Sequence, residues 1–454
     1  MSITYKEYDT KYRLPEQAKD ELNLLEKKHY VLCYEPGKGK SMPVVHCINE
    51  INKRMNGRAK VLILSDATCI KNMWMTDIYP QEILPKYTVM VTDRSAINKD
   101  TQAGLLAVKW DIIVCDECQS LRSGVTRAKS KYAKLVYQLT KKCEYVWGMT
   151  GTIAGNNNIE PFCVLHNLNI GRCGTINCNK FKRDYCINEL QYGPFGAFEK
   201  PTKLNTYGER LMKEHFDNYC SFWGYDNNDD MPELQIEYKR FIVNETETYK
   251  NALEGILQIG DYESTVQKTI ALQKAQQALN GFIYYDLPTE DGEKLERYTN
   301  YVPEFYNPKL DEVVNDCKQD IQIIGYRYQE DAICISRELD KINIKYTYDI
   351  QDFKTRVLNG EFVILLLQCS RGKAVNLQDV CTNIIYYTCD FSFINYKQFI
   401  HRCWRRGQTK PCKIKFLINE VENDNHHIEY KIWQSLQNKQ NIHDTLMNIK
   451  NKEV

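Results

Sequence analysis

The chain has 454 residues, of which 43% are hydrophobic and 26% charged, and its formal net charge at pH 7 is +1. This length exceeds one ordinary core, so two or three domains are expected, with the composition of a soluble globular protein. A net charge near zero excludes a global field that favours nucleic acid, so any nucleic-acid site has to be a local basic groove.

The N-terminus and the cysteines favour a cytoplasmic protein. Residues 1–13 are polar and lack an apolar core, so no signal peptide is expected. No apolar run approaches the roughly 18–20 residues of a membrane helix, so no membrane partner is expected. The 18 cysteines are scattered along the chain, which favours reduced, mostly buried thiols over a disulfide framework.

The first half alternates short apolar runs with amphipathic segments, which predicts a parallel sheet covered by helices on both faces. The runs that read as buried strands are 29–35, 59–66, 87–93, 110–117 and 144–151. Amphipathic segments at 42–55 and 129–142 read as helices. Ligands of such sheets bind outside the carboxyl ends of the strands, where 37–41, 116–117 and 150–152 fall.

The second half repeats this pattern after a less regular middle, with helices expected over about 165–305. A polar patch at 224–233 predicts the main boundary, so we expect one domain over residues 1–228 and a second over 229–454. Strands of a second α/β sheet are expected at 321–327, 361–369, 382–390 and 412–419. A final segment with helical periodicity, 426–449, is expected to pack back across the body.

The stretch YEPGKGKSMPV, residues 34–44, follows a predicted strand and precedes a predicted helix, as a phosphate loop does. Gly37 and Gly39 would let backbone N–H groups turn toward phosphate oxygens at a helix N-terminus. Lys40 would reach the β- and γ-phosphates, and Ser41 would offer a hydroxyl to Mg²⁺. The strict G-x-x-x-x-G-K-[ST] pattern fails because Tyr34 replaces the first glycine, and a polar turn with two lysines is the alternative.

The stretch IIVCDECQS, residues 112–120, allows two interpretations. Cys115 and Cys118 have the spacing of a zinc half-site or a thiol switch. Asp116 would instead hold Mg²⁺ in its second shell, and Glu117 would orient and deprotonate the attacking water. A solvated strand end is a third possibility. An acidic pair on a strand that neighbours a phosphate loop favours the ATPase interpretation, and strand alternation points Cys115 away from Asp116.

The order of motifs resembles the superfamily 2 helicases and translocases, specifically their Swi/Snf-like branch, along nearly the full chain. RLPEQAKDEL is similar to the Q motif, which implies that Gln17 reads adenine. EPGKGKS is similar to motif I, which implies ATP binding by residues 37–41, with Lys38 where a neutral residue is usual. VLILSDATCIKNMW is similar to motif Ia and contains the tryptophan of the branch, Trp74; it implies nucleic-acid contacts for Ser65 and Thr68. DECQ resembles the DExx box.

The remaining motifs complete the resemblance. MTGTIAGNN is similar to motif III, which implies a coupling role for Thr150, Gly151 and Thr152. LLLQCSRGKAVNLQ resembles motif V, which implies a nucleic-acid contact for Ser370, although Ala374 stands where a glycine is usual. QFIHRCWRRGQ has the spacing of motif VI, and its matching residues are Gln398, Arg402, Arg405, Gly407 and Gln408.

Motif VI has a physical reason in this family. ATP on the first lobe needs positive charge from the second lobe at the transferring phosphoryl group. Arg402 and Arg405, one helical turn apart, are expected to present two guanidinium groups there, and Gln398 to help bind ATP. A basic surface helix is the alternative for this segment. His401 is expected to pack or cap rather than to catalyse.

The resemblance implies an α/β protein of two RecA-like lobes with helical insertions and a C-terminal brace helix. It implies a monomeric ATP- and Mg²⁺-dependent motor on duplex or branched DNA, similar to compact phage-type helicases and then located in the host cytoplasm. Alternatives are true strand separation or branch migration, RNA as the track, a degenerate ATPase-fold scaffold, and a thiol switch. Retention of the catalytic residues Lys40, Asp116, Glu117, Arg402 and Arg405 disfavours the scaffold.

A second group of cysteines, Cys163, Cys173, Cys178 and Cys186, invites a zinc interpretation. Its spacing lacks any C-x2-C pair, so the metal signal is poor. The resemblance instead places an F-x-x-x-Y helix at this point of the chain, in the stretch FKRDYC.

Overall fold

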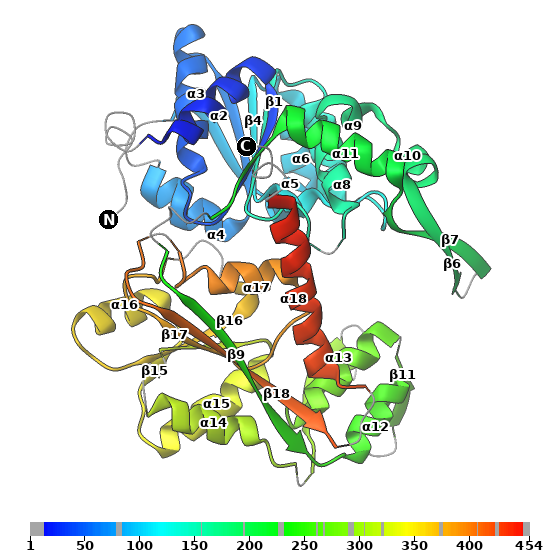
Figure 1. Ribbon diagram of the computed structural model, residues 1–454, viewed down its shortest axis with the longest axis vertical. Coiled ribbons are helices and arrows are strands. Elements are labelled where there is room, and N and C mark those ends of the chain that lie inside the picture. The colour runs from blue at the N-terminus through cyan, green and yellow to red at the C-terminus, as the bar shows by residue number, and fades with distance from the viewer. Residues whose placement is uncertain are drawn as a thin grey trace. The chain divides into compact units, whose positions relative to one another are not determined.

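The chain divides into two compact units, one formed by Met1–Asp229 with Lys439–Val454 and the other by Asp230–Asn438 (Figure 1). The predicted boundary between residues 228 and 229 lies outside the residues that the structure describes. The computed structural model describes residues 13–78, 84–155, 157–193, 196–225, 231–259, 262–266, 268–288, 295–303, 305–318, 322–371, 376–405, 407–422 and 426–447.

The first unit contains a six-stranded sheet in which every pairing is parallel. In sheet order its strands are β3 (Tyr87–Thr92), β2 (Lys60–Ser65), β4 (Ile112–Asp116), β5 (Tyr145–Thr150), β1 (His29–Tyr34) and β8 (Cys220–Trp223). The five strands predicted here are confirmed. The edge strand β8, which pairs with β1, was not predicted.

Alternating side chains of these strands pack on opposite faces, as expected for a doubly covered sheet. Leu62 and Leu64 belong to a core with α7 (Lys131–Thr140) and α8 (Glu160–Asn167). Val61 and Ile63 face the other way. Their core includes residues of α2 (Pro15–Lys27), α3 (Ser41–Arg54) and the π-helical segment η2 (Ile70–Ile78). The central strands are therefore covered on both faces, and a ligand is expected at the carboxyl ends of the strands.

The second unit repeats this architecture with another all-parallel six-stranded sheet. Its strands, in sheet order, are β15 (Tyr346–Thr347), β16 (Ile364–Gln368), β14 (Ile323–Tyr326), β17 (Asn383–Tyr386), β18 (Cys412–Val421) and β9 (Leu234–Val243). The four predicted strands are confirmed. The edge strand β9 is followed directly along the chain by α12 (Glu247–Glu254). The two sheets with their covering helices are the two predicted RecA-like lobes.

The middle of the chain contains antiparallel hairpins as well as the expected helices. They are β6 (Cys186–Gly193) with β7 (Gly196–Leu204), β10 (Ile256–Ile259) with β11 (Tyr262–Thr265), and β12 (Phe282–Pro288) with β13 (Leu295–Tyr301). In Figure 1 the β6–β7 hairpin extends away from the helices of its unit. The β6–β7 hairpin was missed because many of its described side chains are exposed, so it lacks the buried apolar runs of the two sheets. β12 was missed although Phe282 and Ile283 are buried.

The remaining helical elements connect and cover these strands. They are α4 (Ala67–Cys69), α5 (Asp93–Ala96), α6 (Lys99–Ala107), η4 (Cys118–Leu121), α9 (Gly171–Thr175), α10 (Cys178–Tyr185), α11 (Thr206–Tyr219), α13 (Lys268–Ala278), α14 (Pro308–Cys317), α15 (Gln329–Lys341), α16 (Ile350–Leu358), η5 (Cys369–Arg371), α17 (Phe393–Ile400) and α18 (Ile428–Met447).

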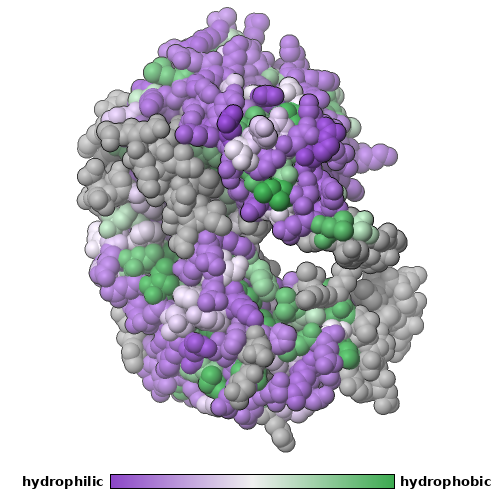
Figure 2. All heavy atoms as spheres, turned by 45° about the vertical axis from the view of Figure 1, so that its right-hand side comes forward, coloured by the Kyte–Doolittle hydropathy of each residue, from purple (hydrophilic) through white to green (hydrophobic). Residues whose placement is uncertain are grey.

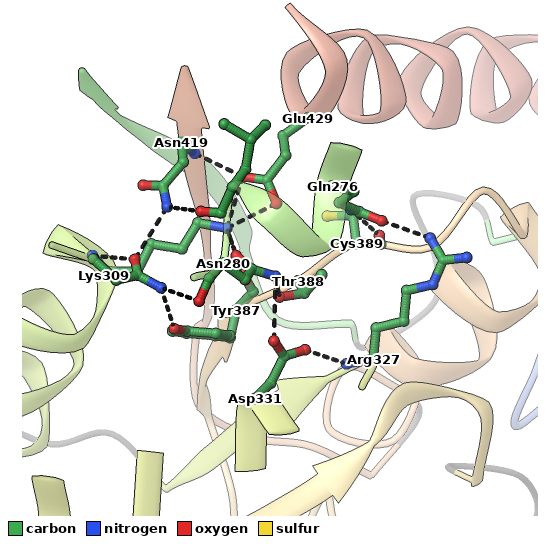
Figure 3. Close-up of polar contacts among 12 residues, drawn as sticks. Gln276, Asn280, Lys309, Arg327, Asp331, Tyr387, Thr388, Cys389, Asn419 and Glu429 are labelled. Atoms are coloured by element: carbon green, nitrogen blue, oxygen red, sulfur yellow. Dashed lines mark hydrogen bonds and ion pairs between the residues drawn. The ribbon is translucent and has the colours of Figure 1, made fainter. Parts of the chain in front are cut away.

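The predicted C-terminal helix is α18, and a buried polar network fixes its first turn in the second unit (Figure 3). Lys309 is fully buried, and its Nζ lies 2.7 Å from Glu429 Oε2 of α18 and donates to Asn280 Oδ1 at 3.0 Å. Glu429 also accepts from the Asn419 N–H of β18 at 2.7 Å. A brace role across both lobes stays a prediction.

Most of the thiols are buried, and polar residues predominate on one face of the molecule (Figure 2). On the face shown in Figure 2 hydrophilic residues predominate, and hydrophobic ones occur in small groups. Within the described residues no helix combines the length and apolarity that crossing a membrane requires. All 18 cysteines are free thiols, and 16 of them are buried, as the sequence predicts.

Candidate nucleotide site

The segment between β1 and α3 has the backbone of a phosphate loop. Gly37 and Gly39 have φ of 87° and 70°, a left-handed conformation that glycine adopts without steric cost. A Cβ on Gly39 would lie 3.0 Å from Gln17 Nε2, so a side chain there would require Gln17 to shift. The missing first glycine has a structural reason: Tyr34 ends β1, is fully buried and donates to Asp20 Oδ2 at 2.6 Å.

The loop leads directly into α3, which begins at Ser41 with Lys40 as its N-cap. The first N–H groups of a helix lack partners within the helix and carry partial positive charge, which suits an anion. Ser41 is partly exposed, with its hydroxyl 3.4 Å from Met73 Sδ. This local geometry matches what the sequence predicts for residues 37–41.

Gln17 contacts the loop itself. It is buried, its Nε2 donates to the carbonyl oxygens of Lys38 at 3.2 Å and Gly39 at 3.4 Å, and its Oε1 accepts from Leu14 N at 3.0 Å. The amide thereby ties the start of α2 to the loop. Its adenine-reading role stays a prediction.

Lys38 of the loop is packed against two aromatic rings. Its side chain is only 2% exposed, and its Nζ lies 4.5 Å from the ring centroid of Trp223. The Tyr225 ring is 5.7 Å from the same atom, and the Tyr225 hydroxyl donates to Pro36 O. The unpredicted strand β8, which ends at Trp223, brings these rings to the loop. The ATP-binding role of Lys38 stays a prediction.

Asp116 is a buried carboxylate with three hydrogen-bond donors around it. Its Oδ2 accepts from Ser65 Oγ and Trp74 Nε1, both at 3.1 Å, and its Oδ1 accepts from Glu117 N at 3.0 Å. Burial and, after it, the negative charge of Glu117 raise the pKa of Asp116 to about 6, although the positive charge of Lys40 acts in the opposite direction. The phosphate-loop lysine and the acidic pair therefore share one electrostatic site.

Two of the predicted motif Ia residues lie near this site. Ser65 is 2% exposed, and its hydroxyl donates to Asp116, so it supports the acidic pair; its predicted nucleic-acid contact stays a prediction. Thr68, the other motif Ia residue, is partly exposed at the start of α4, and its N–H donates to Asp66 Oδ1 at 2.9 Å.

Glu117 leaves the strand in a strained conformation, with φ of 51° and ψ of 48°, which non-glycine residues adopt at a cost. Its carboxylate accepts from Gln119 Nε2. The Gln119 Oε1 in turn accepts from Thr150 Oγ1 at 2.7 Å, and Thr150 accepts from Thr152 N at 2.9 Å. A continuous hydrogen-bond path therefore joins the acidic pair to the end of β5.

Gly151 connects this path to the phosphate loop. A Cβ on Gly151 would lie 3.4 Å from Pro36 Cδ and 3.5 Å from Tyr34 O. The 150–152 segment thus lies against the start of the loop on one side, and on the other it is linked to Glu117 through Gln119. The structure brings together three motifs that the sequence could only place at strand ends.

The cysteines around the acidic pair are core residues. Cys115 is 1% exposed and Cys118 is fully buried, and burial raises the pKa of both thiols. A buried thiol held neutral is a poor nucleophile and a poor metal ligand, which disfavours the thiol-switch alternative.

The second group of cysteines is also part of the first unit's core. Cys163, Cys173 and Cys186 are buried in it, and Cys178 packs against it. In the part of the chain that the structure describes, no group of three or more His, Cys, Asp and Glu side chains is placed to hold a metal ion.

The motif VI residues occupy the end of α17 and the turn that follows. The sequence placed Arg402 and Arg405 on one helix, but α17 ends at Ile400, so both arginines lie in the turn. Arg402 is 8% exposed and its carbonyl accepts from Leu377 N at 3.0 Å, while the partly exposed Arg405 donates to Asn376 Oδ1.

Neighbouring residues fix this turn to the second sheet. Gln408 Nε2 donates to Gln378 O at 2.8 Å and to Cys381 O at 2.9 Å. His401 Nδ1 lies 3.0 Å from Trp404 O, and the two rings stack, so His401 packs as predicted.

Two other predicted site residues of this unit lie outside the turn that carries Arg402 and Arg405. Gln398 is partly exposed on α17, and Ser370 is exposed in η5 at the carboxyl end of β16. Ala374 lies outside the described residues.

Sequence reasoning recorded Trp74 as a motif residue but missed its hydrogen bond to Asp116. It also missed Gln119 as the link between the acidic pair and Thr150, and Trp223 and Tyr225 as partners of the loop. The tryptophan of motif Ia was the available signal for the first. The others depend on strand order, which a single sequence does not reveal.

Comparison with known proteins adds little to these observations. No family model and no curated protein matches the chain. One similar solved structure is the Sulfolobus solfataricus SWI2/SNF2 ATPase core in complex with dsDNA, at 17% identity and a TM-score of 0.37. The match covers 96% of this chain and 93% of that chain. A likeness this remote carries no argument about activity, so the functional argument rests on the site.

Proposed function

We propose that the chain is a nucleic-acid-dependent ATPase that moves along duplex or branched DNA without sequence specificity, using ATP and Mg²⁺. The observation that carries the proposal is the single site formed by the glycine-turned loop, Lys40 and the Asp116–Glu117 pair, joined through Gln119 to Thr150.

The residues present fit Mg²⁺-ATP. The loop N–H groups and Lys40 would bind the β- and γ-phosphates, and Ser41 and Asp116 would hold Mg²⁺, with Asp116 acting through bound water. Mg²⁺ neutralises phosphate charge when bound. Ser65 and Trp74 keep the Asp116 carboxylate in one orientation, so its geometry is set before a nucleotide arrives.

Glu117 would accept the proton of the attacking water. Its position directly after Asp116 at the end of β4 and its hydrogen bond from Gln119 fix where the Glu117 carboxylate lies. A movement of Glu117 during turnover would shift Gln119 and, through it, Thr150, because the three side chains are hydrogen-bonded in series. The 150–152 segment could couple hydrolysis to other parts of the protein in this way.

The second unit would supply Arg402 and Arg405 to the phosphoryl group being transferred, where guanidinium groups stabilise developing negative charge. Gln398 would assist nucleotide binding. Hydrolysis would then change how the two units engage each other, and thereby how they hold the track.

The proposed track is DNA, held mainly through its phosphates, with Thr68 and Ser370 as candidate contacts. Backbone contacts read no sequence, so no sequence specificity is expected. RNA as the track and true strand separation remain the alternatives within this class. The scaffold alternative is disfavoured by the intact set of catalytic side chains.

An ATPase assay with double-stranded DNA, single-stranded DNA, forked DNA and RNA tests the proposal. We expect hydrolysis to rise with DNA and to be abolished in Glu117→Gln while its nucleotide binding persists. Hydrolysis no faster with any nucleic acid than without would contradict the proposal, and full activity of Glu117→Gln would contradict the site. A preference for RNA would select the RNA alternative.

A further inference from the structure

The phosphate loop contacts the end of β8 and the residues that follow it. Glu35 N, the first loop amide, donates to Trp223 O at 3.0 Å, which continues the β1–β8 pairing beyond the strand. The Tyr225 hydroxyl donates to Pro36 O. The Tyr34 and Trp223 rings meet edge to face, with centroids 5.1 Å apart. Successive backbone positions of the loop are therefore attached to one short segment.

Lys38 strengthens this attachment through its side chain. Its ammonium lies 4.5 Å from the Trp223 ring centroid and 5.7 Å from that of Tyr225. At 2% exposure the ammonium has lost most of its water, and a cation over an aromatic face recovers part of the lost hydration energy. Gln17 binds the carbonyl of Lys38 from the other side. We call the contacts of Trp223 and Tyr225 with Pro36 and Lys38 the aromatic clasp.

The clasp lies where the chain leaves the first unit. Tyr225 is followed after only five positions by Asp230, the first residue of the second unit. Five residue steps span at most about 18 Å even when fully extended. The noncovalent contacts of the clasp therefore link the phosphate loop to a residue that is only five positions from the second unit.

We propose that Trp223 and Tyr225 are positioning residues for the phosphate loop, and that through them nucleotide binding is coupled to the chain segment that enters the second unit. The inference rests on the proposed function. Phosphate anions in the loop attract the Lys38 ammonium and compete with the rings for it. A shift of the loop at Pro36 pulls directly on the Tyr225 hydroxyl. Coupling of this kind is reciprocal, so the state of the connection also alters ATP affinity.

A double-mutant cycle tests the clasp. Lys38→Met keeps the stem and removes the charge, and Trp223→Leu keeps apolar bulk and removes the ring. We expect each to raise the KM for ATP about 3- to 10-fold and to lower the stimulation of kcat by DNA, because each breaks the same cation–π contact. The double variant should be no worse than the worse single variant, since the interaction is already lost.

Two further variants separate positioning from folding. Tyr225→Phe removes only the hydroxyl that donates to Pro36 O, so the variant should fold. We expect its melting temperature to stay close to that of the wild type, while the stimulation of its ATPase activity by DNA falls. Lys129→Met is the matched control, because it removes a cation that lies 4.1 Å from the Tyr137 ring, away from the loop. That control should leave both KM and DNA stimulation at the wild-type values.

The outcomes distinguish this inference from the proposed function. Additive effects of Lys38→Met and Trp223→Leu, or DNA stimulation that is unchanged in Tyr225→Phe, overturn the clasp while wild-type hydrolysis stays DNA-stimulated. If the wild type shows no such stimulation, the proposed function fails. The double-mutant cycle is then measured by equilibrium binding of a fluorescent ATP analogue. The clasp is overturned if the effects of the two substitutions on this affinity are additive. It is also overturned if the wild type does not bind the analogue.

Discussion

At the scale of single residues, the least expected feature is the support of Asp116 by an indole. Trp74 is fully buried, and its N–H donates to the carboxylate that is proposed to act on Mg²⁺. The sequence identified both residues, but their contact depends on β2 and β4 being neighbours, which only the sheet order establishes. Local pattern therefore located the chemical groups, and tertiary structure decided which of them meet.

We expect Trp74→Phe to lower kcat about tenfold and to raise the Mg²⁺ concentration for half-maximal activity, since a hydrogen bond to a charged group contributes about 1.5–3 kcal/mol. Steady-state ATPase assays over a Mg²⁺ titration measure this. Trp147→Phe is the matched control: Trp147 is equally buried, but its indole donates to Leu24 O at 3.1 Å. If both variants lose activity equally, the loss reflects packing, and the role of Trp74 in orienting Asp116 is wrong.

His166 predicts acid sensitivity of the first unit. Burial lowers the pKa of His166 to about 4, and its Nδ1 lies 3.0 Å from Cys173 O. The unfolded chain binds a proton at about pH 6.5 and the folded chain only near pH 4, so stability is lost as the pH falls through this window. Between pH 7 and pH 4 the wild type and His166→Gln should both lose free energy of unfolding. The loss should be about 2–3 kcal/mol smaller in His166→Gln, which lacks the titrating group. Chemical denaturation at several pH values measures the difference; parallel curves would contradict it.

At the scale of elements, the sequence predicted the strands that are buried on both faces and missed those that are not. β16 and β17 are apolar runs because helices cover both of their faces. β8 has only four residues and follows a helix directly, so it is too short to show the alternation of apolar and polar residues that marks a strand. It nevertheless carries Trp223, whose ring contacts Lys38. The motif VI helix was extended too far, because the sequence pattern continues past Ile400 while the backbone turns.

The first turn of α18 depends on the buried pair of Lys309 and Glu429. Lys309→Met leaves the Glu429 carboxylate without its cation, and we expect a loss of about 3–5 kcal/mol in the free energy of unfolding of the second unit. The double variant Lys309→Met with Glu429→Gln should recover much of this, because no charge then remains buried. Denaturant titration measures both, and hydrogen exchange over α18 locates the change. A double variant that is less stable than Lys309→Met would contradict the explanation.

At the scale of the whole molecule, the proposed reaction divides its groups between two units of the same architecture. Lys40 and the acidic pair belong to the first unit, and Arg402 and Arg405 belong to the second. Binding and turnover should therefore be separable by mutation. If one unit carried the whole reaction, substitutions in the other unit would affect neither ATP binding nor turnover. Mutations in each unit therefore test whether the reacting groups are divided between the two.

We expect Lys40→Ala to weaken ATP binding and abolish hydrolysis, because it removes the cation at the phosphates. Arg405→Ala should still bind ATP but lower kcat by at least about 100-fold, since its charge is needed mainly where negative charge develops in the transition state. Equilibrium binding of a fluorescent ATP analogue and single-turnover hydrolysis measure the two effects separately. Arg356→Ala is the matched control, because Arg356 lies on α16 of the same unit and pairs with Asp352 and Glu361. Near-normal hydrolysis in Arg405→Ala would mean that this arginine does not assist the reaction, whereas a selective loss of turnover would place both units at one chemical step.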